Sequence, residues 1–199
     1  MIESKKVQKI LYGGDYNPEQ WPEEIWQEDM RMFKLANIDV VTLNVFSWAS
    51  LQKDDEVYDF SRLDKIMDLA RENGLKVCLA TSTAAHPAWM ARKHPDILRT
   101  EHNGIRRKFG SRHNSCPNSP TYRKYSVALA EKLAERYQGY DNVVSWHISN
   151  EYGGTCYCDN CEKAFRSWLK EKYGTIDELN KAWNMSFWGH TLYDFDDVV

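Results

Sequence analysis

The feature that most constrains the fold is an alternation of strand-like and helix-like segments along the chain. Short apolar runs rich in β-branched residues predict strands over residues 10–14, 40–46, 76–81 and 142–149. Amphipathic or helix-favouring segments predict helices over residues 22–36, 62–73, 88–93, 121–137, 162–173 and 176–183. Parallel neighbours need crossover connections, so four strand-then-helix units in order predict an α/β fold with a parallel sheet.

The length of the chain suggests which α/β fold this is. A closed (β/α)8 barrel takes about 250 residues, whereas this chain has 199 residues and four such units. We therefore expect residues 1–199 to be one domain, the N-terminal part of a TIM (β/α)8 barrel, truncated after its first half. Such a half-barrel would expose two strand edges and an apolar inner face. The alternative is a doubly wound open sheet, but no glycine-rich phosphate loop follows the first strand.

Composition excludes several classes of protein. The chain is 42% hydrophobic and 28% charged, as in ordinary globular proteins. A formal net charge of −3 without a basic block argues against binding to nucleic acids or membranes. The N-terminal residues 1–9 are polar, unlike a signal peptide, and no apolar stretch has the length of a membrane span. These features predict a cytoplasmic protein.

The fourth expected strand leads directly into an amide and an acid, Asn150 and Glu151. Carboxylates at the C-terminal ends of barrel strands are common catalytic groups, and glycosidases use one as a proton donor. Glu151 is therefore a candidate general acid, and the Asn150 amide could hydrogen-bond a sugar hydroxyl. The alternative is an ordinary surface acid, because exposed acids are abundant.

Cysteine spacing predicts a metal site. Cys156, Cys158 and Cys161 form a C-x-C-x2-C motif, and Cys116 can supply a fourth thiolate. Four sulfurs around zinc make a closed tetrahedral site, so the metal would have a structural role. It would join the loops that carry Arg112 and Glu151. The alternative is a set of free thiols, and five cysteines in total fit a reducing compartment better than disulfides.

Several motifs in the same order resemble the family 42 glycoside hydrolases, which are β-galactosidases. They are GGDYNPEQW at residues 13–21, FSWA at 46–49, TSTAAHPAW at 81–89, WHISNEYG at 146–153 and AWNMSFW at 182–188. The resemblance implies that Glu151 is the general acid/base of a retaining β-galactosidase and that Asn150 and Arg112 contact the sugar. It also implies zinc on the four cysteines, a β-galactoside substrate and a homo-oligomeric parent enzyme, commonly a trimer.

The chain departs from the family pattern in two places. The nucleophilic glutamate expected on a later strand has no counterpart in residues 1–199, so we expect this segment to be inactive alone. Residues 51–60 lack the Glu-Pro and glycine that members often carry, which leaves the shape of that loop open. Two other readings remain: a non-catalytic carbohydrate-binding or zinc-stabilised module, and a barrel hydrolase for another β-linked sugar.

Overall fold

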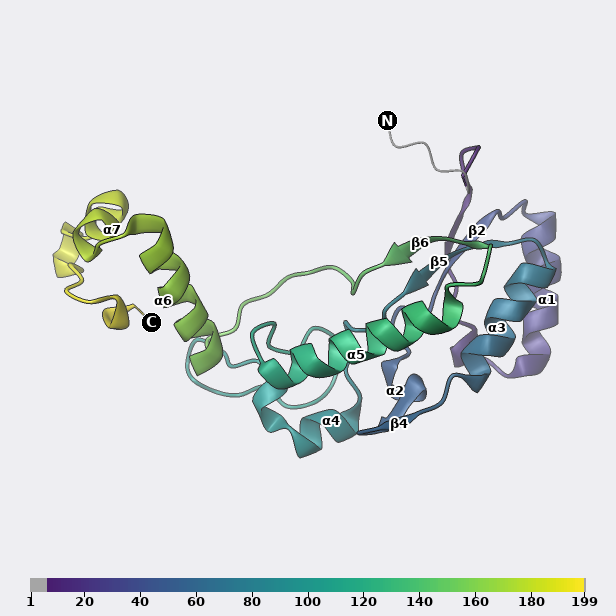
Figure 1. The fold of residues 1–199 in the computed structure, drawn as a ribbon, viewed down its shortest axis with the longest axis horizontal. Helices are drawn as coiled ribbons and strands as arrows, with labels where there is room; N and C mark the ends of the chain where they lie inside the picture. The colour runs from purple at the N-terminus through teal and green to yellow at the C-terminus, as the bar shows by residue number, and fades with distance from the viewer. Residues whose placement is uncertain (1–6, 199) are drawn as a thin grey trace.

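The computed structural model describes residues 7–198, and its centre is a parallel sheet of four strands in the order β1-β2-β5-β6 (Figure 1). These strands are β1 (Gly13–Asp15), β2 (Val40–Leu43), β5 (Lys76–Ala80) and β6 (Val143–His147). The long helices that connect them are α1 (Glu23–Leu35), α3 (Ser61–Glu72) and α5 (Pro120–Tyr137). The prediction of an α/β fold with parallel strands in sequence order is therefore confirmed.

Residues 1–6 and residue 199 lie outside the described part of the chain. Of the polar segment at residues 1–9, the first six residues lie outside the described part, so the interpretation of that segment is not tested. Among residues 7–198, no helix combines the length and apolar character needed to cross a bilayer.

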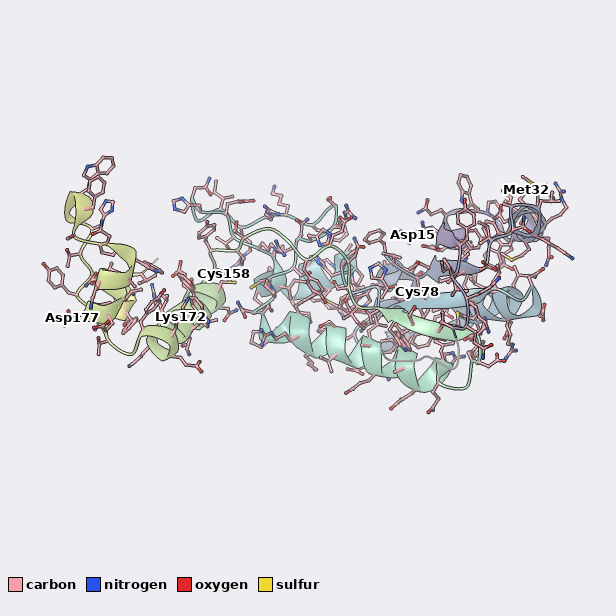
Figure 2. All side chains as sticks on the ribbon, turned by 90° about the horizontal axis from the view of Figure 1, so that it is seen from above. Asp15, Met32, Cys78, Cys158, Lys172 and Asp177 are labelled. Carbon is pink, nitrogen blue, oxygen red and sulfur yellow. The ribbon has the colours of Figure 1, made fainter. Side chains whose placement is uncertain are left out.

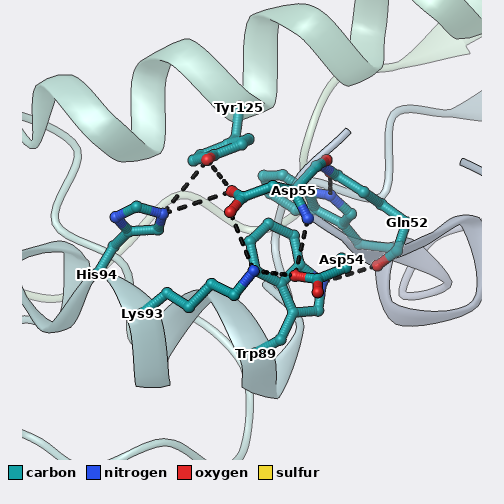
Figure 3. A network of polar contacts seen from close by, with 8 residues as sticks. Gln52, Asp54, Asp55, Trp89, Lys93, His94 and Tyr125 are labelled. Carbon is teal, nitrogen blue, oxygen red and sulfur yellow. Dashed lines mark hydrogen bonds and ion pairs between the residues drawn. The ribbon is translucent and has the colours of Figure 1, made fainter. Parts of the chain in front are cut away.

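A small hairpin that the sequence did not reveal lies between β2 and α3. It follows the short helix α2 (Trp48–Leu51) and consists of β3 (Gln52–Asp54) and β4 (Val57–Tyr58), which pair antiparallel. The Asp55 carboxylate in its turn accepts hydrogen bonds from Lys93 Nζ at 3.0 Å and from the Tyr125 hydroxyl (Figure 3). These contacts fasten the hairpin to α4 (Ala88–Lys93) and α5.

The main hydrophobic core lies between the sheet and its helices. Every second residue of the central strands is fully buried there, namely Val41, Leu43, Val77 and Leu79. They pack with apolar side chains of the helices, among them Met30, Ile66, Met67, Leu129 and Leu133. The opposite face carries Val40, Thr42, Cys78 and Ser145, so the expectation of an apolar inner face is wrong. Cys78 is half-buried on this mixed face.

A second, smaller core belongs to the C-terminal helices. Leu169 of α6 (Asp159–Tyr173), Leu179 of α7 (Ile176–Trp183) and Val198 pack together there. Figure 1 shows this C-terminal lobe, residues 159–198, projecting away from the sheet at the end of an extended segment. The sequence did not indicate a separate core. Whether the chain is one domain stays a prediction.

Candidate active site

The polar site lies where the parallel strands end, and its backbone is unusual. Asn44, Ser82 and Ser149 follow β2, β5 and β6, and all three have positive φ angles, of 72°, 60° and 56°. Left-handed backbone is uncommon for residues other than glycine and collects at functional sites. Each of the three strands therefore turns sharply as it leaves the sheet.

Buried hydrogen bonds join these three turns to one another. Asn44 Nδ2 donates to the Ala80 carbonyl at 2.9 Å, and the Ser82 hydroxyl donates to the Asn44 carbonyl. The backbone N–H of Ser149 donates to Thr81 Oγ1 at 2.9 Å. Buried hydrogen bonds of this kind rigidify their surroundings. The three turns are therefore held in place by buried side chains. None of these side chains belongs to the predicted site residues.

Two of the predicted site residues, which lie in the segments after β5 and β6, form an ion pair. Arg112 Nη2 lies 2.7 Å from Glu151 Oε2, and the two side chains are 44% and 65% exposed. The Arg112 guanidinium also lies 5.5 Å from the ring centre of Phe46, a favourable cation–π distance. Phe46, Arg112 and Glu151 come from the segments after β2, β5 and β6. Three strand-end segments thus converge on one carboxylate.

Asn150 lies beside this pair but makes no contact of its own with it. Its side chain is half-buried and forms no hydrogen bond within residues 7–198. His113, next to Arg112, has a lowered pKa, first because it is partly buried and then because of the positive charges of Arg112 and Arg99. The charges of Arg112, Arg99 and Glu151 therefore all act on the His113 ring.

The four predicted metal ligands also come together. The Sγ atoms of Cys116, Cys156, Cys158 and Cys161 all lie within 4.8 Å of one another. Cys116 Sγ is 3.4 Å from the Sγ atoms of both Cys158 and Cys161. Sulfurs bound tetrahedrally to zinc lie about 3.8 Å apart, given a Zn–S distance of about 2.3 Å. The cluster has the ligand type, number and spacing of a closed metal site.

N–H groups surround the sulfurs of this cysteine cluster. The backbone N–H of Thr100 points to Cys156 Sγ at 3.5 Å, and Asn118 Nδ2 lies 3.4 Å from Cys161 Sγ. Such donors stabilise thiolates and orient them. Without a metal the protonated form is favoured at Cys116, because burial raises the pKa of that thiol. The surroundings therefore fit a bound cation, which would offset this cost of burial.

Comparisons with known proteins agree with this geometry. The sequence model of glycoside hydrolase family 42, described as β-galactosidase, matches residues 15–199. The β-galactosidase BgaA of Planococcus sp. (strain 'SOS Orange') is 65% identical over 195 residues, which are 98% of this chain and 29% of that protein. The β-galactosidase LacZ of Heyndrickxia coagulans is 53% identical over 197 residues, 98% of this chain and 30% of that protein.

Solved structures give the same result. The crystal structure of a β-galactosidase from Bacillus circulans sp. alkalophilus superposes with a TM-score of 0.93 at 64% identity, over 98% of this chain and 29% of that one. The catalytic domain of a Paenibacillus polymyxa β-amylase, at 17% identity and a TM-score of 0.66, shares the fold alone. This chain spans less than a third of the length of its β-galactosidase relatives.

The family match covers nearly the whole chain, including the strand-end segments that carry Arg112, Glu151 and the cysteines. Its architecture is that of the N-terminal half of a (β/α)8 barrel. The chain belongs to glycoside hydrolase family 42.

Proposed function

We propose that this chain supplies the general acid/base half of a retaining β-galactosidase active site, with Glu151 as the acid/base. The observation that carries the proposal is the Arg112–Glu151 pair, which lies at the C-terminal ends of the strands in a chain of this family. The related proteins are named β-galactosidases, which supports a terminal β-galactoside as substrate.

The reaction would proceed by double displacement. Glu151 protonates the glycosidic oxygen while a second carboxylate attacks the anomeric carbon and the bond to the leaving group breaks. Glu151 then removes a proton from water, which attacks the glycosyl-enzyme and releases galactose. Retaining enzymes hold the two carboxyl groups about 5 to 5.5 Å apart. We infer that the nucleophile comes from another part of the barrel, because the relatives are more than three times as long as this chain.

The residues beside Glu151 would orient it and the sugar. Arg112 holds one carboxylate oxygen at 2.7 Å and keeps further N–H donors for a sugar hydroxyl. The Asn150 amide has both donor and acceptor capacity for hydroxyls near the reacting carbon. A hydrogen bond there would contribute to catalysis to the extent that it strengthens in the transition state.

We further propose that the four cysteines hold a structural zinc ion. When bound, zinc would crosslink the segment around Cys116 to the start of α6 and have no coordination position left for substrate. The chain's own part is to present four sulfurs and the N–H donors around them. The five free cysteines support a cytoplasmic location. A trimeric whole enzyme rests on the family resemblance alone.

An exchange chimera tests the catalytic proposal. It is the Planococcus BgaA enzyme in which the segment that this chain matches is replaced by residues 1–199. We expect this chimera to hydrolyse an aryl β-galactoside faster than the matching β-glucoside. With an alkyl β-galactoside, whose leaving group must be protonated, Glu151→Gln should lower kcat/KM by about 10²- to 10⁴-fold, the usual contribution of a general acid/base.

A matched control separates catalysis from a loss of charge. Glu101 is also an exposed glutamate paired with an arginine, Arg107. The Glu101→Gln chimera should keep its activity. Equal activity of the Glu151→Gln and Glu101→Gln chimeras would exclude the acid/base role. A folded wild-type chimera that binds galactose without hydrolysis would favour a carbohydrate-binding module instead.

A further inference from the structure

We propose that Arg99 is a positioning residue for the acid/base: its buried guanidinium holds the backbone of the segment that carries Glu151. The inference rests on the catalytic role proposed for Glu151 and adds a residue outside the predicted site. Arg99 does not touch Glu151. It acts through the carbonyl of Gly153, two residues further along the chain.

Arg99 bridges the two segments that form the site. Its Nε donates to the Ser115 carbonyl at 2.9 Å, and its Nη1 donates to the Gly153 carbonyl at 2.7 Å. Ser115 belongs to the segment after β5, which also carries Arg112, whereas Gly153 belongs to the segment after β6. The same side chain therefore sets the spacing between the two backbones that present the Arg112–Glu151 pair.

The guanidinium is buried in an unusual way. Arg99 is only 8% exposed, yet no carboxylate within residues 7–198 forms an ion pair with it. Removing a cation from water is unfavourable unless hydrogen bonds and neighbouring charges compensate. Here the two backbone carbonyls compensate for the hydration that the guanidinium loses. The hydrogen bonds of Arg99 therefore hold the backbone around the site.

The glycines after Glu151 show how closely the two parts approach. A Cβ atom built on Gly154 would lie 2.3 Å from Arg99 Nη1, and this glycine has a φ of +75°. A Cβ on Gly153 would have no neighbour closer than the Glu151 carbonyl at 3.6 Å. The guanidinium thus lies directly against the backbone of Gly154, in space that a side chain at this position would need.

This contact matters because Glu151 has few other constraints. Its side chain is 65% exposed, and Arg112 is its only ion-pair partner in the described part of the chain. The cysteine ligands begin five residues after Glu151, whereas the Arg99 contact is two residues away. Misplacing a catalytic group by 1 Å can lower a rate by about 10²-fold. Arg99 is placed to prevent such a displacement.

Hydrogen exchange of the 199-residue chain, loaded with zinc, tests the contact without requiring activity. In Arg99→Ala, the amides of Ser149 and Tyr157, which donate to Thr81 Oγ1 and to the Thr100 carbonyl on either side of Gly153, should exchange about tenfold faster or more, the effect of losing a hydrogen bond to a charged group. Exchange in α1 and α3 should not change. Millimolar guanidinium should restore protection in Arg99→Ala, whereas ammonium should not.

Matched variants keep this test decisive. Arg106 is an exposed arginine of the same segment, and Arg106→Ala should leave the Ser149 and Tyr157 amides protected. Arg99→Lys keeps the positive charge but loses the paired N–H donors of the guanidinium. Its exchange rates should therefore lie between those of the wild type and of Arg99→Ala. If Arg99→Ala does not fold, Arg99→Met replaces it: methionine fills similar space without donating hydrogen bonds, so exchange should increase in the same way. Unchanged exchange in folded Arg99→Ala, or in Arg99→Met where Arg99→Ala does not fold, would overturn the proposal.

Kinetics of the exchange chimera then separate positioning from general support. Arg99→Lys should lower kcat by more than it changes KM. In a Glu151→Gln background it should lower kcat much less, because the group that it positions is already absent. An equal loss in both backgrounds would overturn the positioning role of Arg99 alone. A fully active Glu151→Gln chimera would instead overturn the role of Glu151, and with it the inference.

Discussion

At the scale of single residues, the site depends on backbone conformations that residue types do not signal. Glu151 was singled out by its place after a strand, the cysteines by their spacing and Arg112 by the family resemblance, and the structure brings Arg112 to Glu151 and the four sulfurs together. The left-handed conformations of Asn44, Ser82 and Ser149 could not be predicted, since serine and asparagine adopt many conformations elsewhere. Arg99 was missed for the same reason: its partners are carbonyls, which leave no trace in the sequence.

His86 gives a prediction at this scale. It is buried, its Nδ1 lies 2.6 Å from Ser115 Oγ, and burial lowers its pKa to about 4. In the unfolded chain the pKa returns to about 6.5. Between these values the unfolded state binds more protons, so the free energy of unfolding decreases as the pH falls from 6.5 towards 4. The contribution of His86 should be a loss of about 2 kcal/mol from pH 7 to pH 5.

Urea unfolding at pH 7 and pH 5 measures this loss for the wild type and for His86→Asn. The variant cannot titrate in this range but can still hydrogen-bond Ser115. The pH-dependent loss should be smaller in His86→Asn by about 2 kcal/mol. Parallel pH dependences would mean that folding leaves the pKa of His86 unshifted.

At the scale of elements, long periodic segments were predicted well and short ones were not. The long helices α1, α3 and α5 begin and end within one residue of the predicted bounds. The hairpin of β3 and β4 was missed, because strands of three and two residues are too short for a periodic pattern. It is held by side chains from distant segments, above all Lys93 and Tyr125 on Asp55 (Figure 3).

Gln52 is the buried centre of this hairpin and provides a test of it. Its Oε1 accepts from Trp48 Nε1 at 2.8 Å, and its Nε2 donates to the Asp55 carbonyl at 2.6 Å. Gln52→Leu would leave both groups without partners and should lower the free energy of unfolding by about 1–3 kcal/mol. Glu56→Gln, at an exposed position of the same hairpin, should stay within about 0.5 kcal/mol. Chemical denaturation checks both values, and an equal effect of the two changes would show that Gln52 does not hold the hairpin.

At the scale of the whole molecule, the cysteine cluster is the junction between the sheet region and the C-terminal lobe. Figure 2 shows Cys158 between the body that contains Cys78 and the lobe that contains Lys172 and Asp177. The sequence predicted that the four cysteines come together but not this arrangement. Helical periodicity reports which face of a helix is apolar, not which other element covers it. The packing of α6 against α7 in a separate core is therefore known only from the structure.

Metal removal should therefore release the lobe without unfolding the sheet region. Zinc should bind at one ion per chain, and its chelation should raise the radius of gyration measured by X-ray scattering. Helical circular dichroism should change little. Cys161→Ser should resemble the chelated chain, while Cys78→Ser, outside the cluster, should resemble the wild type. Identical scattering curves with and without zinc would contradict the role of the cluster as the junction.

The central claim is that Glu151 is the acid/base, and azide rescue of the Glu151→Ala exchange chimera tests it most directly. With an activated aryl β-galactoside, bond cleavage needs no acid, but the glycosyl-enzyme lacks the base that activates water. Azide needs no base and should restore turnover, giving β-galactosyl azide by nuclear magnetic resonance. Formation of α-galactosyl azide would instead identify Glu151 as the nucleophile, and undiminished hydrolysis without azide would exclude it from the reaction.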